Sequence, residues 1–78
     1  MHNLKDIREH MKVVGSDGKH VGTVDHLEGA DRIKLTKTDP AAKGQHHFIP
    51  AAWVDHIDAE VHLTKSSNEA MREWQTAA

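Results

Sequence analysis

The sequence predicts an all-β protein, and three of its features indicate this fold. Val-rich runs flank an Asp-Gly turn early in the chain, residues 32–37 alternate polar and apolar side chains, and a hairpin-like segment near residue 24 recurs near residue 54. Asp-Gly between apolar runs is a strong hairpin signal, and alternation is typical of a strand with one buried face. We therefore expect a small antiparallel barrel with short terminal helices.

The length of the chain predicts one domain, because domains are typically about 50 to 250 residues long. The 78 residues include 20 large apolar side chains and no Cys. Such a core is thin, and small domains commonly add disulfides, a structural metal or association with other chains. We expect a single domain over residues 1–78, with the barrel at about 11–65 and a C-terminal helix at about 67–75.

The first third of the chain predicts a short helix followed by a hairpin. Apolar residues have helical spacing over Asn3–Met11. Residues 12–14 and 21–28 then form Val-rich runs on either side of a turn at Gly15–Gly18. Gly22 lies inside the second run, where a bulge or sharp bend forms most easily. Such a bend helps a short sheet to curve.

The middle of the chain predicts two strands separated by a loop. Residues 32–37 form a strand with its apolar side chains inward, and residues 38–45 form a polar loop. Residues 46–49 form the next strand, which Pro50 ends or confines to an edge because proline lacks a backbone N–H. Residues 51–53 are then expected to turn a corner.

The last third predicts a tight hairpin and a helix. Residues 54–57 and 60–63 are expected to pair around a two-residue turn at Asp58. Ser67 can cap a helix over about residues 68–75. The apolar face of this helix consists of Ala70, Met71 and Trp74.

The two hairpins resemble each other in sequence. Val-Asp-His-Leu-Glu at residues 24–28 corresponds to Val-Asp-His-Ile-Asp at residues 54–58, and the second strand ends with Leu-Thr-Lys in both. Two copies are too few for a solenoid, which needs about three or more repeats. A small barrel built from two related hairpins fits this pattern.

The run from Val13 to Val24 resembles the first hairpin of the PRC-barrel domain, in which an apolar strand, an Asp-Gly turn and an aliphatic-Gly-x-Val step recur. Ile49-Pro50 followed by Trp53-Val54 and a closing hairpin is also similar to that family. More narrowly, residues 21–26, 33–37 and 46–50 resemble small stand-alone bacterial PRC-barrel-like proteins of unknown function.

This resemblance covers about residues 7–65 and implies a six-stranded, strongly bent antiparallel barrel. It also implies a docking role. The wider family includes the cytoplasmic barrel of the photosynthetic reaction centre H subunit and the C-terminal domain of a ribosome maturation factor, and both act as docking modules. Neither of their partners is carried over to this chain.

The charge pattern does not indicate polyanion or membrane binding. Ten Lys and Arg against twelve Asp and Glu give a net charge of -2, with the signs mixed along the chain. No segment approaches the roughly 18 apolar residues of a membrane-spanning helix, so we expect a cytoplasmic protein. The eight His residues would bring the net charge to about +6 if all were protonated. We expect acid to weaken the assembly between about pH 7.5 and 5.5.

The histidines raise the question of a metal site, since imidazole and carboxylate alone can bind zinc or nickel. Neighbouring strand residues point to opposite faces, so His46 and His47 cannot share a site unless a bulge intervenes, and the same holds for Asp25 and His26. We assign no metal and no cofactor. A cross-strand site remains the second alternative function, with candidates His20, His26, His47, His56 and His62.

Catalytic motifs are weak, and we expect no enzyme. Ser16 lies in the hairpin turn, and Ser66 and Ser67 lie where a helix needs a cap. The early glycines are not followed by the Gly-Lys-Ser/Thr of a phosphate-binding loop. Asp58 and Glu60 flank a turn and are expected to be a solvated hairpin tip.

Nucleic-acid binding would need a basic face with aromatic side chains. The chain has one Phe, two Trp and no Tyr. A modest basic patch is conceivable from Lys12, Lys34, Lys37 and Lys65. An RNA- or ribosome-associated accessory domain is therefore the first alternative function.

The function we expect is a non-catalytic binding or scaffolding module that self-associates as a dimer or tetramer. An unidentified protein partner is also compatible with this hypothesis. Closed symmetry is usual among soluble assemblies. The residues expected at the interface are Phe48, Trp53, Met71 and Trp74.

Overall fold

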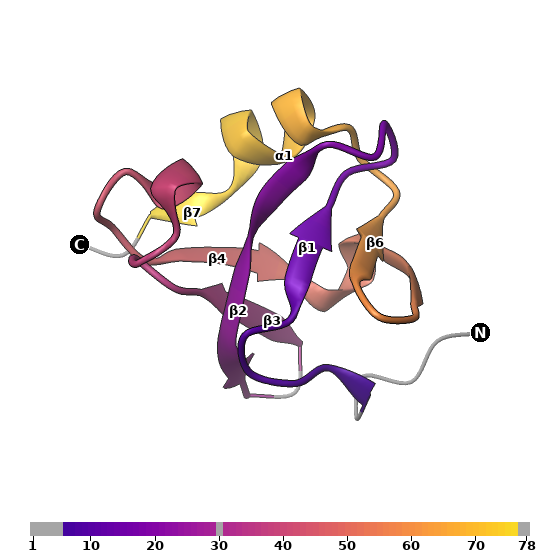
Figure 1. Cartoon of the computed structure of the whole chain (residues 1–78), viewed down its shortest axis with the longest axis horizontal. Helices are drawn as coiled ribbons and strands as arrows, with labels where there is room; N and C mark the ends of the chain where they lie inside the picture. Colours follow the sequence, from indigo (N-terminus) through magenta and orange to yellow (C-terminus); the bar gives the residue numbers. More distant parts are fainter. Residues whose placement is uncertain (1–5, 30, 77–78) are drawn as a thin grey trace.

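The computed structural model describes residues 6–29 and 31–76, and a single β-sheet dominates them (Figure 1). The strands within these residues are β1 (Lys12–Val14), β2 (His20–Glu28), β3 (Arg32–Leu35), β4 (His47–Pro50), β5 (Val54–Ile57), β6 (Val61–Leu63) and β7 (Gln75–Thr76). The sheet is accompanied by helix α1 (Ser67–Glu73) and by the 3₁₀ turns η2 (Pro40–Ala42) and η3 (Ala51–Trp53). The all-β fold class is confirmed.

The strand order in the sheet is β5-β6-β1-β2-β3-β4-β7. Neighbouring strands are antiparallel, except that β1 and β6 are parallel. The nine-residue strand β2 pairs with β1 through its first half and with β3 through its second half. In Figure 1, β2 runs lengthwise beside β1, while β3 and β4 cross behind it. One long strand therefore joins the two halves of the sheet.

The predicted six-stranded antiparallel barrel is wrong. The described part of the chain contains a seven-stranded mixed sheet that stays open, with β5 and β7 as its edges. β7 pairs with the outer edge of β4, and a strand that closed the barrel would have to occupy that edge. The parallel pair β1–β6 requires a long connection between its strands, and local sequence patterns do not reveal such a pairing.

The bulge or bend predicted at Gly22 is confirmed as a break in strand register beside this residue. The pairing of β1 with β2 changes register between Val13 and Val14, next to the position where Gly22 faces Val13. A Cβ atom at Gly22 would lie 3.1 Å from Cδ1 of Leu35. The missing side chain thus allows β2 to curve closely against a core residue of β3.

The core is formed by the inward-facing residues of these strands. The predicted inward orientation of Ile33 and Leu35 is confirmed, since both are almost fully buried. Ala70 of α1 packs against the same cluster. The most deeply buried large side chains are Ile33, Leu35, Ile49, Leu63, Val13, Val21, Val24 and Val61.

The predicted helix over Asn3–Met11 is wrong in its second half, and Asn3 itself lies outside the described residues. Residues 8–11 form a turn in which the N–H of Met11 donates to Arg8 O at 3.2 Å. His10 N–H donates to Val24 O, and Val24 N–H donates to Met11 O. Pairing with the backbone of β2 therefore replaces helical hydrogen bonds in this segment.

The C-terminal helix is shorter than predicted and is capped by Ser66 rather than Ser67. The Ser66 hydroxyl accepts from Glu69 N–H at 3.2 Å, and the Glu69 carboxylate accepts from Ser66 N–H, which completes a capping box. The helix ends at Glu73 because Trp74 has extended backbone angles. Gln75 and Thr76 form β7, which the sequence did not predict.

Candidate site on the β5–β6 hairpin

The two hairpins predicted from the repeated Val-Asp-His sequence are β2–β3 and β5–β6, and each contains a bulge at its Asp. In β2–β3 the pairing passes from Val24–Leu35 to His26–Lys34, which leaves Asp25 as the extra residue. This bulge interrupts the alternation that would separate Asp25 from His26. The two side chains meet, with 3.0 Å between Asp25 Oδ2 and His26 Nδ1.

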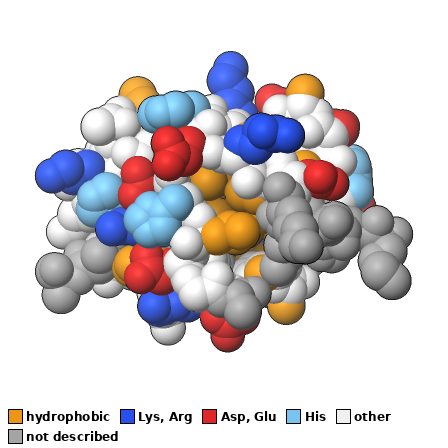
Figure 2. Space-filling model, turned by 90° about the horizontal axis from the view of Figure 1, so that it is seen from below, with side chains coloured by type: hydrophobic (Ala, Val, Ile, Leu, Met, Phe, Trp, Pro, Cys, Tyr) orange, Lys and Arg blue, Asp and Glu red, His pale blue; other side chains and the backbone are white. Residues whose placement is uncertain are grey.

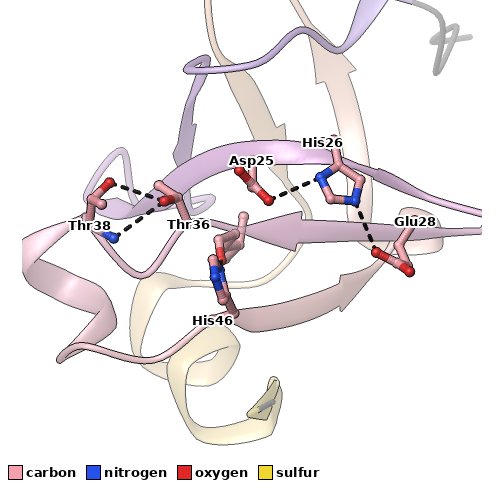
Figure 3. A network of polar contacts seen from close by, with 7 residues as sticks. Asp25, His26, Glu28, Thr36, Thr38 and His46 are labelled. Carbon is pink, nitrogen blue, oxygen red and sulfur yellow. Dashed lines mark hydrogen bonds and ion pairs between the residues drawn. The ribbon is translucent and has the colours of Figure 1, made fainter.

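Figure 3 shows the polar cluster on β2–β3. His26 lies between two carboxylates, because Glu28 Oε2 is 3.0 Å from its Nε2 atom. The residue directly across the ladder is Lys34. A single imidazole thus faces an ammonium group across this hairpin.

The second hairpin repeats this geometry with one difference. Its pairing passes from Val54–Leu63 to His56–His62, so that Asp55 is the extra residue. Asp55 Oδ2 lies 2.8 Å from His56 Nδ1. The position equivalent to Lys34 is occupied by His62, and the rings of His56 and His62 stack with centroids 4.2 Å apart and an interplanar angle of 11°.

Asp58 joins these two histidines at the hairpin tip. Its Oδ1 atom is 2.9 Å from His62 Nε2, and its Oδ2 atom is 4.0 Å from His56 Nε2. One ligand-capable atom from each of the three residues lies within 4.8 Å of the other two. The side chains of His56, Asp58 and His62 are 55%, 59% and 27% exposed, which leaves them free to rearrange.

The carboxylate of Asp58 is held in its charged form. The N–H of Glu60 donates to Asp58 Oδ1 at 2.8 Å, and this bond contributes most to lowering the pKa of Asp58 below its ordinary value of 3.8. The hydrogen bond with His62 lowers the pKa further, burial raises it by a smaller amount, and the nearby His62 and His56 add still smaller decreases. Asp58 is therefore an anionic group at neutral pH.

An open cavity of about 380 Å³ adjoins the cluster. One wall is the β1–β2 turn, and the other is the β5–β6 hairpin. The residues that line it include Gly15, Ser16, Gly18, Asp55, His56 and His62. A small ligand entering this cavity would meet both stacked imidazoles.

The other histidines singled out in the sequence lie elsewhere. His20 Nε2 is 2.6 Å from Asp39 Oδ2, which also accepts from the Thr23 hydroxyl at 2.5 Å. His47 is buried, with its Nε2 atom 2.9 Å from Ala42 O. Of the five candidate histidines, the structure brings together only His56 and His62.

His47 connects the C-terminal tail to the sheet. Its ring stacks on Trp74 with centroids 3.8 Å apart, and its Nδ1 atom is 3.1 Å from the Thr76 hydroxyl. These contacts explain why the chain leaves the helix at Trp74 and pairs with β4. Sequence reasoning missed this role, although a His within an apolar strand is a signal for a buried polar partner.

The four residues expected at an interface are all half-buried, and they lie in different surroundings. Phe48 lies beneath the guanidinium of Arg32 at 4.7 Å and lines a second cavity of about 300 Å³. Trp53 lies beneath the ammonium of Lys65 at 5.2 Å. Met71 is on α1, and Trp74 packs on His47. The described contacts do not join these four residues into one patch.

The serines of α1 serve structural purposes, as their positions predict. Ser66 caps the helix, and Ser67 donates its hydroxyl to Asp17 Oδ2 at 2.9 Å. Burial of Asp17 opposes its ionisation, but hydrogen bonds from Ser67 and Lys19 together lower the pKa of this carboxyl group below 3.8. The contact between this turn residue and the start of α1 was not predicted, because Asp17 already had a local explanation in the Asp-Gly turn.

Comparison with known proteins gives a family without an assigned activity. The family described as "Uncharacterized protein conserved in bacteria (DUF2171)" matches residues 7–71. No curated protein and no solved structure matches the chain. The PRC-barrel resemblance has no family match and stays unconfirmed. Within the described residues, no helix has the length and apolar character needed to cross a membrane. Because the family match to residues 7–71 covers most of the 78-residue chain, the chain belongs to this family of uncharacterized bacterial proteins.

Proposed function

We propose that this protein is a non-catalytic binding module that associates with a second copy of itself through strand β5. The observation that carries the proposal is the place of β5 at an edge of the open sheet. An edge strand presents backbone N–H and C=O groups that can pair with another strand. The docking role implied by the PRC-barrel resemblance agrees with a module of this kind.

The side chains around β5 also favour pairing with an identical strand. Trp53, which directly precedes the strand, and Ile57, its last residue, are half-buried hydrophobic residues packed against the core. Asp55 and His56 are largely exposed between them. In an antiparallel pair with its two-fold axis between these two residues, Asp55 of one copy faces His56 of the other. Such an interface is self-complementary, as two-fold symmetry requires.

Sedimentation of the untagged protein tests this proposal, and a chelator in the buffer excludes bridging by metal ions. We expect a dimer at tens of micromolar. His56→Asp should shift the protein to a monomer, because Asp55 would then face a second carboxylate. His26→Asp is the matched control, since it changes the equivalent residue of β2, which is paired on both sides.

Two results would contradict the proposal. A wild-type mass that remains monomeric at all of these concentrations would exclude self-association. A dimer that survives His56→Asp and dissociates with His26→Asp would place the interface elsewhere.

The RNA-associated alternative receives less support. Acidic, basic and histidine side chains are interspersed on the face shown in Figure 2, and Lys65 is paired with Glu73 at 3.3 Å. Binding to polyanions falls steeply with salt concentration. RNA binding at low salt that is lost at higher salt, by a protein that stays monomeric, would favour this alternative.

A further inference from the structure

We propose that His56, Asp58 and His62 form a binding site for a first-row divalent transition-metal ion such as Zn²⁺. The site would use Nε2 of each histidine and one carboxylate oxygen of Asp58. This inference does not rest on self-association, because all three ligands come from one hairpin of one chain, and the experiment below separates the two although His56 takes part in both.

The distances allow the three groups to converge on one ion. Bonds of about 2.0 to 2.2 Å in a tetrahedral site require ligand atoms about 3.4 Å apart. One ligand-capable atom from each residue already lies within 4.8 Å of the other two. The Asp58 carboxylate is 2.9 Å from His62 Nε2 and 4.0 Å from His56 Nε2. Because the three side chains are partly or largely exposed, small rotations about their χ angles can bring the ligands together without displacing the core.

Groups outside the three ligands orient two of them, His56 and Asp58. The contact between Asp55 and His56 Nδ1 favours a proton on Nδ1, which leaves the Nε2 lone pair available to a metal. The N–H of Glu60 holds Asp58 at the tip of the turn. A carboxylate behind a histidine ligand is the common arrangement in metal sites, where it orients the ring and strengthens the ligand.

The donor set determines the class of ion. Two imidazoles and one carboxylate suit zinc and its transition-metal neighbours, whereas calcium and magnesium prefer ligand sets made of oxygen. Three protein ligands leave a coordination position open. Because His56 and His62 line the 380 Å³ cavity, water or a small ligand can reach that position.

The β2–β3 hairpin provides an internal control for this inference. It has the same Asp, His and acidic residue, and its histidine also contacts two carboxylates. Lys34 stands where the second hairpin has His62. An ammonium group cannot bind a metal and repels a cation, so we assign no site to β2–β3.

Isothermal titration of the untagged, metal-free protein with Zn²⁺ tests the proposal. We expect one ion per chain, accompanied by changes in the side-chain ¹⁵N NMR signals of His56 and His62. His56→Ala and His62→Lys should each weaken binding at least tenfold, because even the loss of an outer contact costs about 10- to 100-fold in affinity. His26→Ala is the matched control and should bind as the wild type does.

Circular dichroism in zinc-free buffer verifies that each variant folds. If His62→Lys does not fold, Asp58→Asn replaces it as the second ligand variant. Three results would overturn the proposal: no stoichiometric binding by the wild type, undiminished binding by the folded ligand variants, or equal loss in His26→Ala. Mass measured in chelator tests self-association separately, so the two proposals can fail independently.

Discussion

The hairpins β2–β3 and β5–β6 share a sequence motif and a bulge, but they differ in position and chemistry. β2–β3 lies inside the sheet, with further strands on both sides, whereas β5 is an edge strand. His26 faces Lys34 in the first hairpin, and His56 faces His62 in the second. The comparison shows that one cross-strand residue can separate a structural charge cluster from a candidate metal site on the same backbone.

The largest expected effect concerns the core residues that the two hairpins have in common. Leu35 and Leu63 are equivalent and almost fully buried. Leu35→Ala should lower the free energy of unfolding by about 3 to 5 kcal/mol, and Leu63→Ala by about 2 to 3 kcal/mol, because β6 lies nearer an edge and has more room to relax. Urea unfolding measures both values. A larger loss for Leu63→Ala would mean that the edge hairpin contributes more to stability than the interior one.

A substitution that gives the β2–β3 hairpin the cross-strand histidine of β5–β6 tests whether this one residue accounts for the difference in metal binding. If the backbones are equivalent, Lys34→His places a second imidazole opposite His26 and should raise the zinc stoichiometry from one to two ions per chain. Lys37→His is the control, because residue 37 lies beyond the end of β3. A stoichiometry that stays at one in folded Lys34→His would show that the bulges differ in their geometry.

The smallest expected effect is the acid dependence contributed by Asp58. Its pKa in the folded protein is lowered below 3.8, so the unfolded chain takes up the proton first as the pH falls. The stability that the charged Asp58 carboxylate contributes is therefore fully present above pH 3.8 and is lost as the pH falls through the lower pKa of the folded protein. Asp58→Asn should reduce the drop in melting temperature between pH 5 and pH 2.5.

The control for this measurement is Glu28→Gln, which changes the acidic residue at the corresponding place in the first hairpin. We expect Glu28→Gln to leave more of the acid dependence intact than Asp58→Asn. The same drop in both variants and the wild type would show that the Glu60 and His62 contacts do not stabilise the Asp58 carboxylate.

Features determined by neighbouring residues were predictable from the sequence. The turn at Gly15–Gly18, the inward-facing side chains of β3 and the hairpin around Asp58 each follow from patterns within a few residues. The parallel pairing of β1 with β6 was not predictable in this way, because it joins distant segments. β7 was missed because it depends on contacts between the tail and His47.

The candidate site was only partly predictable, for a similar reason. The repeated Asp-His pair indicated that the hairpins were related. However, regular pairing onward from Val54–Leu63 would place Asp55, not His56, opposite His62. The bulge shifts the register by one residue and brings the two imidazoles together. One extra residue in a strand thus determines which side chains meet, and strand patterns do not specify where it falls.

The parallel pairing of β1 with β6 has a kinetic consequence. Hairpins between neighbouring strands close short loops and form within about 1 to 10 μs. Contact between Val13 and Val61 must instead close a loop that contains most of the chain, at a greater cost in chain entropy. Proteins that depend on such distant contacts fold more slowly than helical proteins of the same size. We therefore expect the rate of folding to be limited by the docking of the β5–β6 hairpin onto β1.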